Sequence, residues 1–185
     1  MKKALYLDAD DTIWKVYPGG IASICKPPYE RVDDNVIKGR ISADEFLPYG
    51  LDDLCYIALK DGARELIEYA REQNMDVVLV SANDPQPVEE AIKALDLEFD
   101  RTYVGWFKKG KIDVIKRDMA KHGISEGVYI DDNALVEVLA YCKDHPSDCK
   151  KVGNNITVED LEIYDDIYDY IWDIYVEKVL KEEKY

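Results

Sequence analysis

The sequence contains few of the residues from which structural metal sites are built. It has two histidines, His122 and His145, which lie far apart, and four cysteines with no CxxC pair among them (Cys25, Cys55, Cys142 and Cys149). A structural zinc site needs tighter ligand spacing than this. Cys142 and Cys149 flank the loop-like stretch KDHPSD and could form a disulfide, but reduced thiols are the expected state in an ordinary cytosol.

Long apolar runs and basic residues are also scarce. No uninterrupted apolar stretch is long enough to span a bilayer, and the apolar run after MKK ends at Asp8, too soon for a secretory signal peptide. Acidic residues number 39 against 24 basic ones, a formal net charge of -15 that repels nucleic acids and anionic membranes. We therefore expect a cytoplasmic protein that binds neither nucleic acid nor membrane.

What the sequence does contain is an alternation of strand and helix patterns. The 185 residues, 47% of them hydrophobic, suffice for one domain with a substantial core. Alternating strands and helices predict an α/β fold, a doubly wound, mostly parallel, Rossmann-like sheet. The strands are expected at 3–7, 76–81, 101–106, 127–131 and 150–153, and the helices at 61–74, 87–97, 111–123 and 133–143.

Two segments interrupt this alternation. The segment 13–60 carries turn signals around short strand-like pieces and a capping box at Ser42 and Glu45, which predicts a β-flap with a short helix. In the tail, 157–185, apolar residues recur three or four apart, which predicts a helix. The predicted organisation is a catalytic core (1–12 and 61–156), an inserted cap (13–60) and a C-terminal helix packed on the core (157–185).

Acidic residues follow two of the predicted strands. Asp8 and Asp10 come at the end of the first strand in LYLDADDTIW, Asp131 and Asp132 end another in VYIDD, and Ser81 ends a third. The carboxyl ends of parallel strands meet at one edge of a sheet, where the functional crevice lies. Acids gathered there repel one another unless they share a cation, and oxygen ligands of this kind suit Mg²⁺. We therefore predict a magnesium site held by Asp8, Asp10, Asp131 and Asp132.

These motifs, taken together and in this order, resemble those of the haloacid dehalogenase-like superfamily of phosphohydrolases. LYLDADDT matches the first motif, DxDxT after an apolar strand, VVLVS matches the second, and VYIDD the fourth. The third motif is a lysine near the start of a later helix, for which KKGKIDV offers Lys108, Lys109 and Lys111. The small magnesium-dependent phosphatases of type one look most similar, on the strength of DADDTIW, of GKIDVIKRDMAKHGI and of the insert after the first motif.

The resemblance implies a role for each matching residue. Asp8 would be the nucleophile that forms an aspartyl-phosphate, and Asp10 the general acid and base, with its main-chain carbonyl as a metal ligand. Ser81 would donate a hydrogen bond to the phosphoryl group, and Lys111 would supply a positive charge to it, with Lys109 as the alternative. The residues expected to contact substrate are Ser81, Ala82, Asn83 and Trp14.

Several alternatives remain open at this stage. A phosphomutase could use the same scaffold, and a non-catalytic receiver domain or an idle binding protein could carry a similar acidic cluster. The substrate is a small-molecule phosphate ester or a phosphoprotein, and the protein is a monomer or a homodimer. The insert leaves the sheet beside Asp10, so Trp14 or Tyr17 is expected to meet the leaving group of the substrate.

Overall fold

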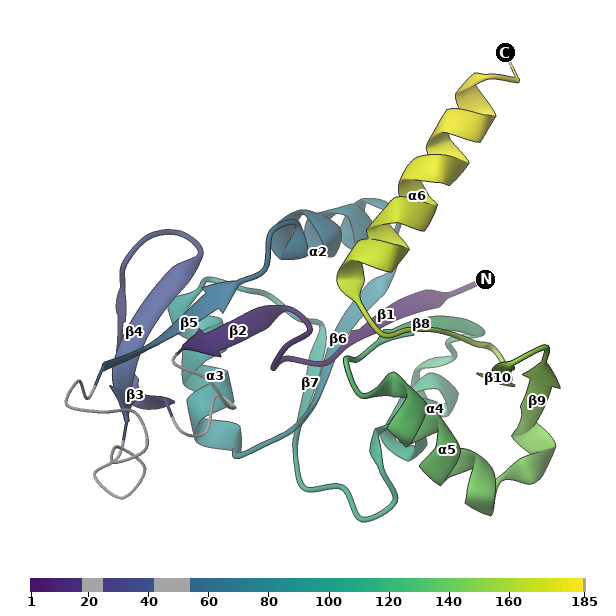
Figure 1. Cartoon of the computed structure of the whole chain (residues 1–185), viewed down its shortest axis with the longest axis horizontal. Helices are drawn as coiled ribbons and strands as arrows, with labels where there is room; N and C mark the ends of the chain where they lie inside the picture. The colour runs from purple at the N-terminus through teal and green to yellow at the C-terminus, as the bar shows by residue number, and fades with distance from the viewer. Residues whose placement is uncertain (18–24, 42–53, 185) are drawn as a thin grey trace.

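The centre of the protein is a seven-stranded, mostly parallel sheet. The computed structural model describes residues 1–17, 25–41 and 54–184. The strand order is β7-β6-β1-β8-β11-β10-β9 (Figure 1). The five strands from β7 to β11 in this order are parallel to one another, whereas β10 is antiparallel to both of its neighbours, β11 and β9. The strands are β1 (Lys3–Leu7), β6 (Asp76–Ala82), β7 (Arg101–Gly105), β8 (Glu126–Ile130), β9 (Cys149–Val152), β10 (Asn155–Val158) and β11 (Leu161–Tyr164).

Helices cover both faces of this sheet, which confirms the predicted α/β class. In β1, Leu5 and Leu7 point toward one face and Ala4 and Tyr6 toward the other, and all four are fully buried. A strand buried on both faces reads as a continuous apolar run, as KALYL does. The helices α2 (Ala63–Glu72) and α3 (Pro85–Ala94) pack on the first face, and α4 (Lys111–His122) and α5 (Ala134–Asp144) on the second.

A second, antiparallel sheet lies between β1 and α2 in the chain. Its strands are arranged in the order β2-β5-β4-β3, at the left of Figure 1. One edge packs against α3, where the hydroxyl of Tyr29 donates to the carbonyl of Pro87 at 3.3 Å. The predicted short helix with Ser42 and Glu45 lies outside the described residues. The bounds are β2 (Trp14–Tyr17), β3 (Cys25–Arg31), β4 (Val36–Ile41) and β5 (Leu54–Leu59).

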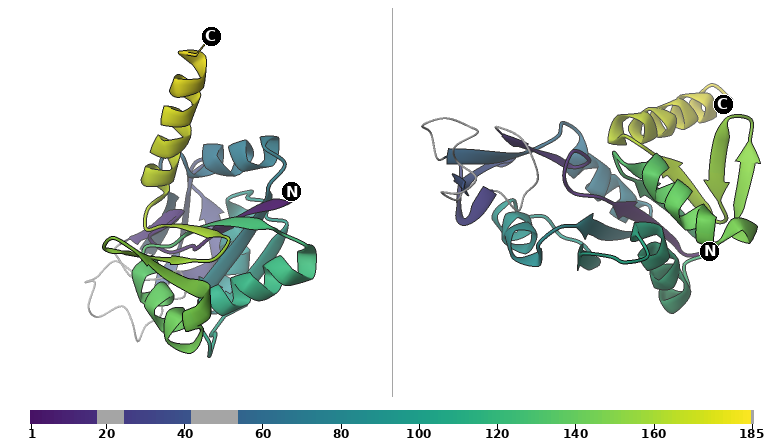
Figure 2. Two further views of the ribbon diagram at one scale, coloured as in Figure 1. Left: turned by 90° about the vertical axis from the view of Figure 1, so that its right-hand side faces the viewer. Right: turned by 60° about the horizontal axis from the view of Figure 1, so that its bottom comes forward.

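The structure confirms a C-terminal helix, but the predicted start near residue 157 was wrong. The chain first forms β10 and β11, and α6 (Ile167–Glu182) begins only after them. Leu161 pairs with Gly127 of β8, so β11 extends the central sheet beyond the predicted core boundary at 156. Apolar residues three apart at 161, 164 and 167 mimic a helical face, but the first two belong to a strand. In Figures 1 and 2, α6 projects from the body, with the C-terminus at its far end.

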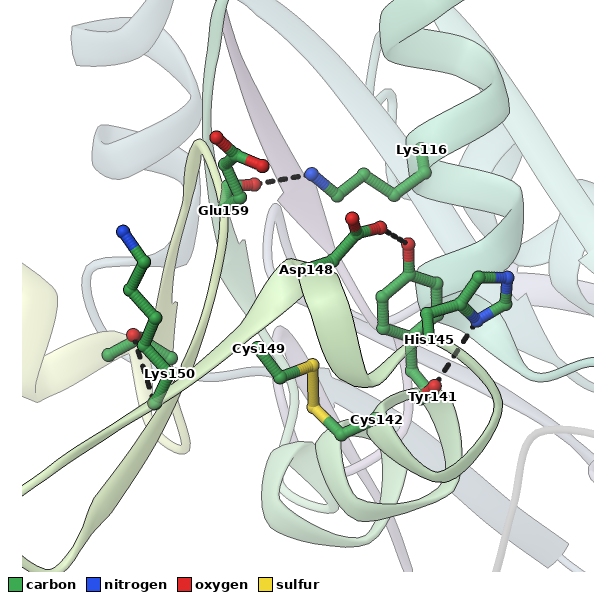
Figure 3. The surroundings of a disulfide bond; sticks show 9 residues. Lys116, Tyr141, Cys142, His145, Asp148, Cys149, Lys150 and Glu159 are labelled. Carbon is green, nitrogen blue, oxygen red and sulfur yellow. Dashed lines mark hydrogen bonds between the residues drawn. A yellow bond between two sulfur atoms is a disulfide. The ribbon is translucent and has the colours of Figure 1, made fainter.

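The expectation of reduced thiols was also wrong, because the cysteines form two disulfides. Cys25 and Cys55 connect β3 to β5, and Cys142 and Cys149 connect α5 to β9 (Figure 3). No helix in the part of the chain that the structure describes has the length and apolarity needed to cross a bilayer. Disulfides persist mainly in oxidising compartments or in hyperthermophiles, so the cytoplasmic location stays a prediction.

A buried ion-pair network ties α4 to the sheet on the face that carries α5. Asp118 is 3% exposed and accepts hydrogen bonds from the guanidinium of Arg101 at 2.7 and 2.9 Å, from Tyr103 at 2.6 Å and from Tyr6 at 2.8 Å. Burial alone would raise the pKa of Asp118, but the hydrogen bonds from Arg101, Tyr103 and Tyr6 hold it below its usual value. The network is therefore strongest when this carboxylate is ionised.

We expect Asp118→Ala to lower the free energy of unfolding by about 3 kcal/mol, because it leaves buried donors unpaired. Since the folded pKa lies below the unfolded one, the loss should be complete at neutral pH and shrink as the pH falls below about 4. Urea unfolding at pH 7 and pH 3.5 measures both effects. Glu98→Ala is the control, because Glu98 is 83% exposed and its carboxylate pairs with Arg71 at 3.4 Å, so its loss should cost less than about 1 kcal/mol. Equal losses in the two variants would contradict this account.

Candidate active site

Two carboxylates and one lysine meet at the carboxyl end of the central sheet. Leu7 pairs with Ile130, so the residues that follow them, Asp8 and Asp131, lie next to each other on neighbouring strands. Lys111 reaches both: its Nζ lies 2.9 Å from Oδ1 of Asp8 and 2.7 Å from Oδ2 of Asp131. All three side chains are buried. The sequence motifs predicted that the first and fourth motifs meet here.

The lysine of the site is Lys111. It is the first residue of α4, whereas Lys109 precedes the helix and is exposed. The N-cap residue Gly110 has a positive φ and no side chain to accept the free N–H groups of the first turn. Glu137 of α5 supplies that acceptor, since its Oε2 takes the main-chain N–H of Lys111 at 2.9 Å. Glu137 thus fixes the start of α4, although no sequence motif pointed to it.

We expect Lys111→Ala to reduce any phosphatase turnover by about two orders of magnitude, because it removes one strong electrostatic stabiliser. Lys109→Ala is the matched control and should retain the wild-type rate. The measurement is kcat on an activated phosphate ester, with circular dichroism to confirm folding. A large loss in the Lys109 variant alone would assign the role to Lys109.

Asp131 is held by donors on both of its carboxylate oxygens. Oδ2 accepts from the hydroxyl of Tyr129 as well as from Lys111, and Oδ1 accepts the main-chain N–H of Asn133 at 2.8 Å. Tyr129 was absent from the predicted site. Residues 129 and 131 are two apart, and side chains of a strand alternate between its faces. That periodicity is the signal that places Tyr129 beside Asp131.

The site carries more negative than positive charge. Burial and the neighbouring charge of Asp131 raise the pKa of Asp8 to about 8, against the attraction of Lys111. Partial loss of hydration also raises the pKa of Asp132, and the charge of Asp131 adds to this. Burial alone would lower the pKa of Lys111, but the charges of Asp8 and Asp131 raise it, so the lysine remains an ammonium. One ammonium does not balance these carboxylates.

The donor atoms fit a hard divalent cation. Asp8, Asp131 and Asp132 each place one carboxylate oxygen within 4.8 Å of the others, and Asp132 is exposed. Mg²⁺ prefers such oxygen ligands and retains water at its open positions. Thr12 also contributes to the arrangement, because its hydroxyl oxygen accepts the main-chain N–H of Asp132 at 3.1 Å. Three of the four predicted metal residues are thus close enough to bind one ion.

Asp10, the fourth, turns its side chain in another direction. Its Oδ1 accepts the indole N–H of Trp14 at 2.8 Å, and its Oδ2 accepts the side-chain amide of Asn83 at 2.6 Å. Trp14 and Asn83 are fully buried. Trp14 therefore orients Asp10 from a buried position, and its predicted contact with substrate stays a prediction. Asn83, also predicted to bind substrate, has the same orienting contact.

We expect Trp14→Phe to lower kcat on all phosphate esters by a similar factor of about 10, because it keeps an aromatic ring at this position but removes the N–H that donates to Asp10. The measurement is kcat and KM across a set of esters with different leaving groups. A change in the ranking of the esters would show that Trp14 does contact the leaving group.

The remaining predicted residues lie on β6. Leu79 pairs with Leu7, so β6 brings Ser81 to the same end of the sheet as Asp8. Ser81 is buried, and Ala82 follows it at the end of the strand on the wall of a cavity beside Lys111. Tyr17, expected near the leaving group, lies at the end of β2 and is exposed.

Comparison with known proteins leaves the chemistry of the site to be inferred from its own side chains. No protein-family model matches the chain, and no curated protein matches it in sequence.

Proposed function

We propose that the protein is a magnesium-dependent phosphatase that hydrolyses phosphate monoesters through an aspartyl-phosphate, similar to the small type-one phosphatases of the haloacid dehalogenase-like superfamily. The observation that carries this proposal is the bridge from Lys111 to both Asp8 and Asp131 at the carboxyl end of parallel strands. A second carboxylate, Asp10, is held two residues after Asp8 by Asn83 and Trp14.

The side chains supply the parts that ester hydrolysis needs. A carboxylate oxygen of Asp8 attacks phosphorus, the bond to the leaving oxygen breaks, and Asp10 gives that oxygen a proton. Asp10 then takes a proton from water, whose oxygen attacks phosphorus and releases phosphate and the Asp8 carboxylate. Lys111 and Ser81 stabilise the phosphoryl oxygens throughout. When bound by Asp8, Asp131 and Asp132, Mg²⁺ would offset the repulsion between the carboxylates and a dianionic phosphate.

Asp10 favours hydrolysis over the alternatives. A receiver domain needs an acceptor aspartate but no acid and base, and its acidic pair comes on the first strand instead of a late one such as β8. A phosphomutase would also need groups that hold a sugar in two orientations. We further propose that the antiparallel sheet β2-β5-β4-β3 is a cap, because β2 begins at Trp14, which contacts Asp10.

The test is hydrolysis of para-nitrophenyl phosphate by the purified protein with Mg²⁺, followed by a panel of sugar phosphates, nucleotides and phosphopeptides. We expect turnover of the activated ester and a preference within the panel. A folded, Mg²⁺-loaded protein that turns over no member of the panel would contradict the proposal and favour a receiver or an idle scaffold.

A further inference from the structure

The hydroxyl of Tyr129 donates a hydrogen bond to a carboxylate oxygen that already has another donor. That oxygen is Oδ2 of Asp131, which also accepts from the Nζ of Lys111 at 2.7 Å. The other oxygen, Oδ1, accepts the main-chain N–H of Asn133 at 2.8 Å. Tyr129 and Asp131 are both fully buried, so protein donors take the place of water around this carboxylate.

These donors limit how Asp131 can bind an ion. An ionised carboxylate has about four lone-pair positions, two on each oxygen. Tyr129 and Lys111 use both positions on Oδ2, and Asn133 uses one position on Oδ1. Among the hydrogen bonds of the described residues, this leaves one position, on Oδ1, for a metal ion. Asp131 can therefore bind the ion through one oxygen but not through both.

Tyr129 stays a donor under all ordinary conditions. Its burial raises the pKa of the phenol well above the ordinary value, and the negative charge of Asp131 adds to this effect. The hydroxyl therefore keeps its proton and does not itself become an anionic ligand. What it does to the ion acts through Asp131.

A second buried tyrosine provides a comparison. Tyr6 on β1 pairs with Tyr129 on β8, and both side chains pack in the core on the second face of the sheet. A buried tyrosine hydroxyl needs an acceptor, and Tyr6 finds one in Asp118, within the network that ties α4 to the sheet. The two tyrosines fill the core alike, but the acceptor of Tyr129 is a predicted metal ligand.

Mg²⁺ and Ca²⁺ differ in how they use a carboxylate. Mg²⁺ takes an octahedron of ligands at about 2.0–2.1 Å, whereas Ca²⁺ takes about six to eight oxygens at about 2.3–2.6 Å and often binds both oxygens of one carboxylate. We propose that Tyr129 is a positioning residue that favours Mg²⁺ over Ca²⁺, because its hydroxyl restricts Asp131 to binding through one oxygen. This rests on the metal site of the proposed function.

The first experiment measures the Kd of Mg²⁺ and of Ca²⁺ by titration calorimetry, without substrate, in the wild type, Tyr129→Phe and Tyr6→Phe. Tyr129→Phe should weaken Mg²⁺ binding by about tenfold, the usual effect of losing a hydrogen bond to a metal ligand. It should not weaken Ca²⁺ binding, because it frees a position on Oδ2. The ratio of the Ca²⁺ Kd to the Mg²⁺ Kd should therefore fall by about tenfold.

Tyr6→Phe is the matched control, because it removes an equally buried hydroxyl from the same core. It should leave the Kd ratio at the wild-type value even if it lowers stability. An unchanged ratio in Tyr129→Phe, the same fall in Tyr6→Phe, or a wild type that binds neither ion would overturn the proposal. Lys111→Met is a second variant that frees a position on the same oxygen, and it too should lower the ratio.

The second experiment locates the oxygens of Asp131 around the ion in crystals grown with Ca²⁺. We expect one oxygen within about 2.6 Å of Ca²⁺ in the wild type and both oxygens in Tyr129→Phe. One oxygen in both crystals, or two in both, would contradict the role of the hydroxyl.

Neither experiment uses turnover, so the two proposals can fail separately. A protein that hydrolyses no ester, but whose Kd ratio depends on Tyr129, would keep the positioning role and lose the phosphatase. A protein that hydrolyses esters, with a Kd ratio that does not depend on Tyr129, would keep the phosphatase and lose the positioning role.

Discussion

Asp8→Asn is expected to abolish turnover and to leave the protein folded. An amide cannot form the acyl-phosphate. In a site whose residues act together, loss of the nucleophile lowers kcat by at least about a thousandfold. The fold should persist because Asp8 contributes excess negative charge to a buried site: its pKa is raised to about 8 by burial and by the charge of Asp131, against the attraction of Lys111. The thermal midpoint above pH 8 should therefore be unchanged or higher.

The matched control is Asp11→Asn. Asp11 is exposed, and asparagine tolerates its positive φ of 60°. This variant should hydrolyse para-nitrophenyl phosphate at nearly the wild-type rate. A folded Asp8→Asn protein that kept the rate of the Asp11 variant would show that Asp8 is not the nucleophile.

Chelation is expected to have an equally large effect. Excess EDTA should abolish activity, Mg²⁺ should restore it, and Ca²⁺ should substitute badly, because Ca²⁺ takes more ligands at longer distances. Full activity in EDTA would contradict the predicted magnesium requirement.

Thermal stability gives a measure of metal binding that does not depend on activity. Because an unfolded aspartate ionises near pH 4, the raised pKa of Asp8 means that the folded chain binds a proton that the unfolded chain has released. In EDTA the stability contributed by Asp8 should therefore fall as the pH rises from about 4 to about 8. Mg²⁺ offsets the ionised carboxylates, so it should raise the melting temperature more at pH 9 than at pH 6. An equal or smaller increase at pH 9 would mean that the ion does not bind at Asp8.

The sequence predicted the positions of those side chains that directly follow the end of a strand. An apolar strand fixes where the next side chain emerges, and this placed Asp8, Asp131 and Ser81 at one edge of the sheet. The position of Lys111 followed from the helix that it starts. Glu137 could not be predicted, because it caps α4 from a different helix and only tertiary packing brings the two together.

The errors came from patterns that fit two structures. Apolar residues three apart around 161 suit a helix face, but Leu161–Tyr164 form a strand because they pair with β8. For Trp14, closeness to Asp10 in sequence indicated a role near the substrate but not that β2 buries its ring and that its N–H donates to Asp10. The prediction of reduced thiols depended on an assumed cytosolic redox state, which residue patterns do not test.

The most direct test of the account is to look for phosphate on Asp8 during turnover. The protein is mixed with Mg²⁺ and substrate, quenched in acid within one turnover, and digested for mass spectrometry. The account predicts a hydroxylamine-labile phosphoryl group on the peptide that contains Asp8, and none in Asp8→Asn. Hydrolysis of the ester with no such phosphoryl group, or with the group on another residue, would contradict it.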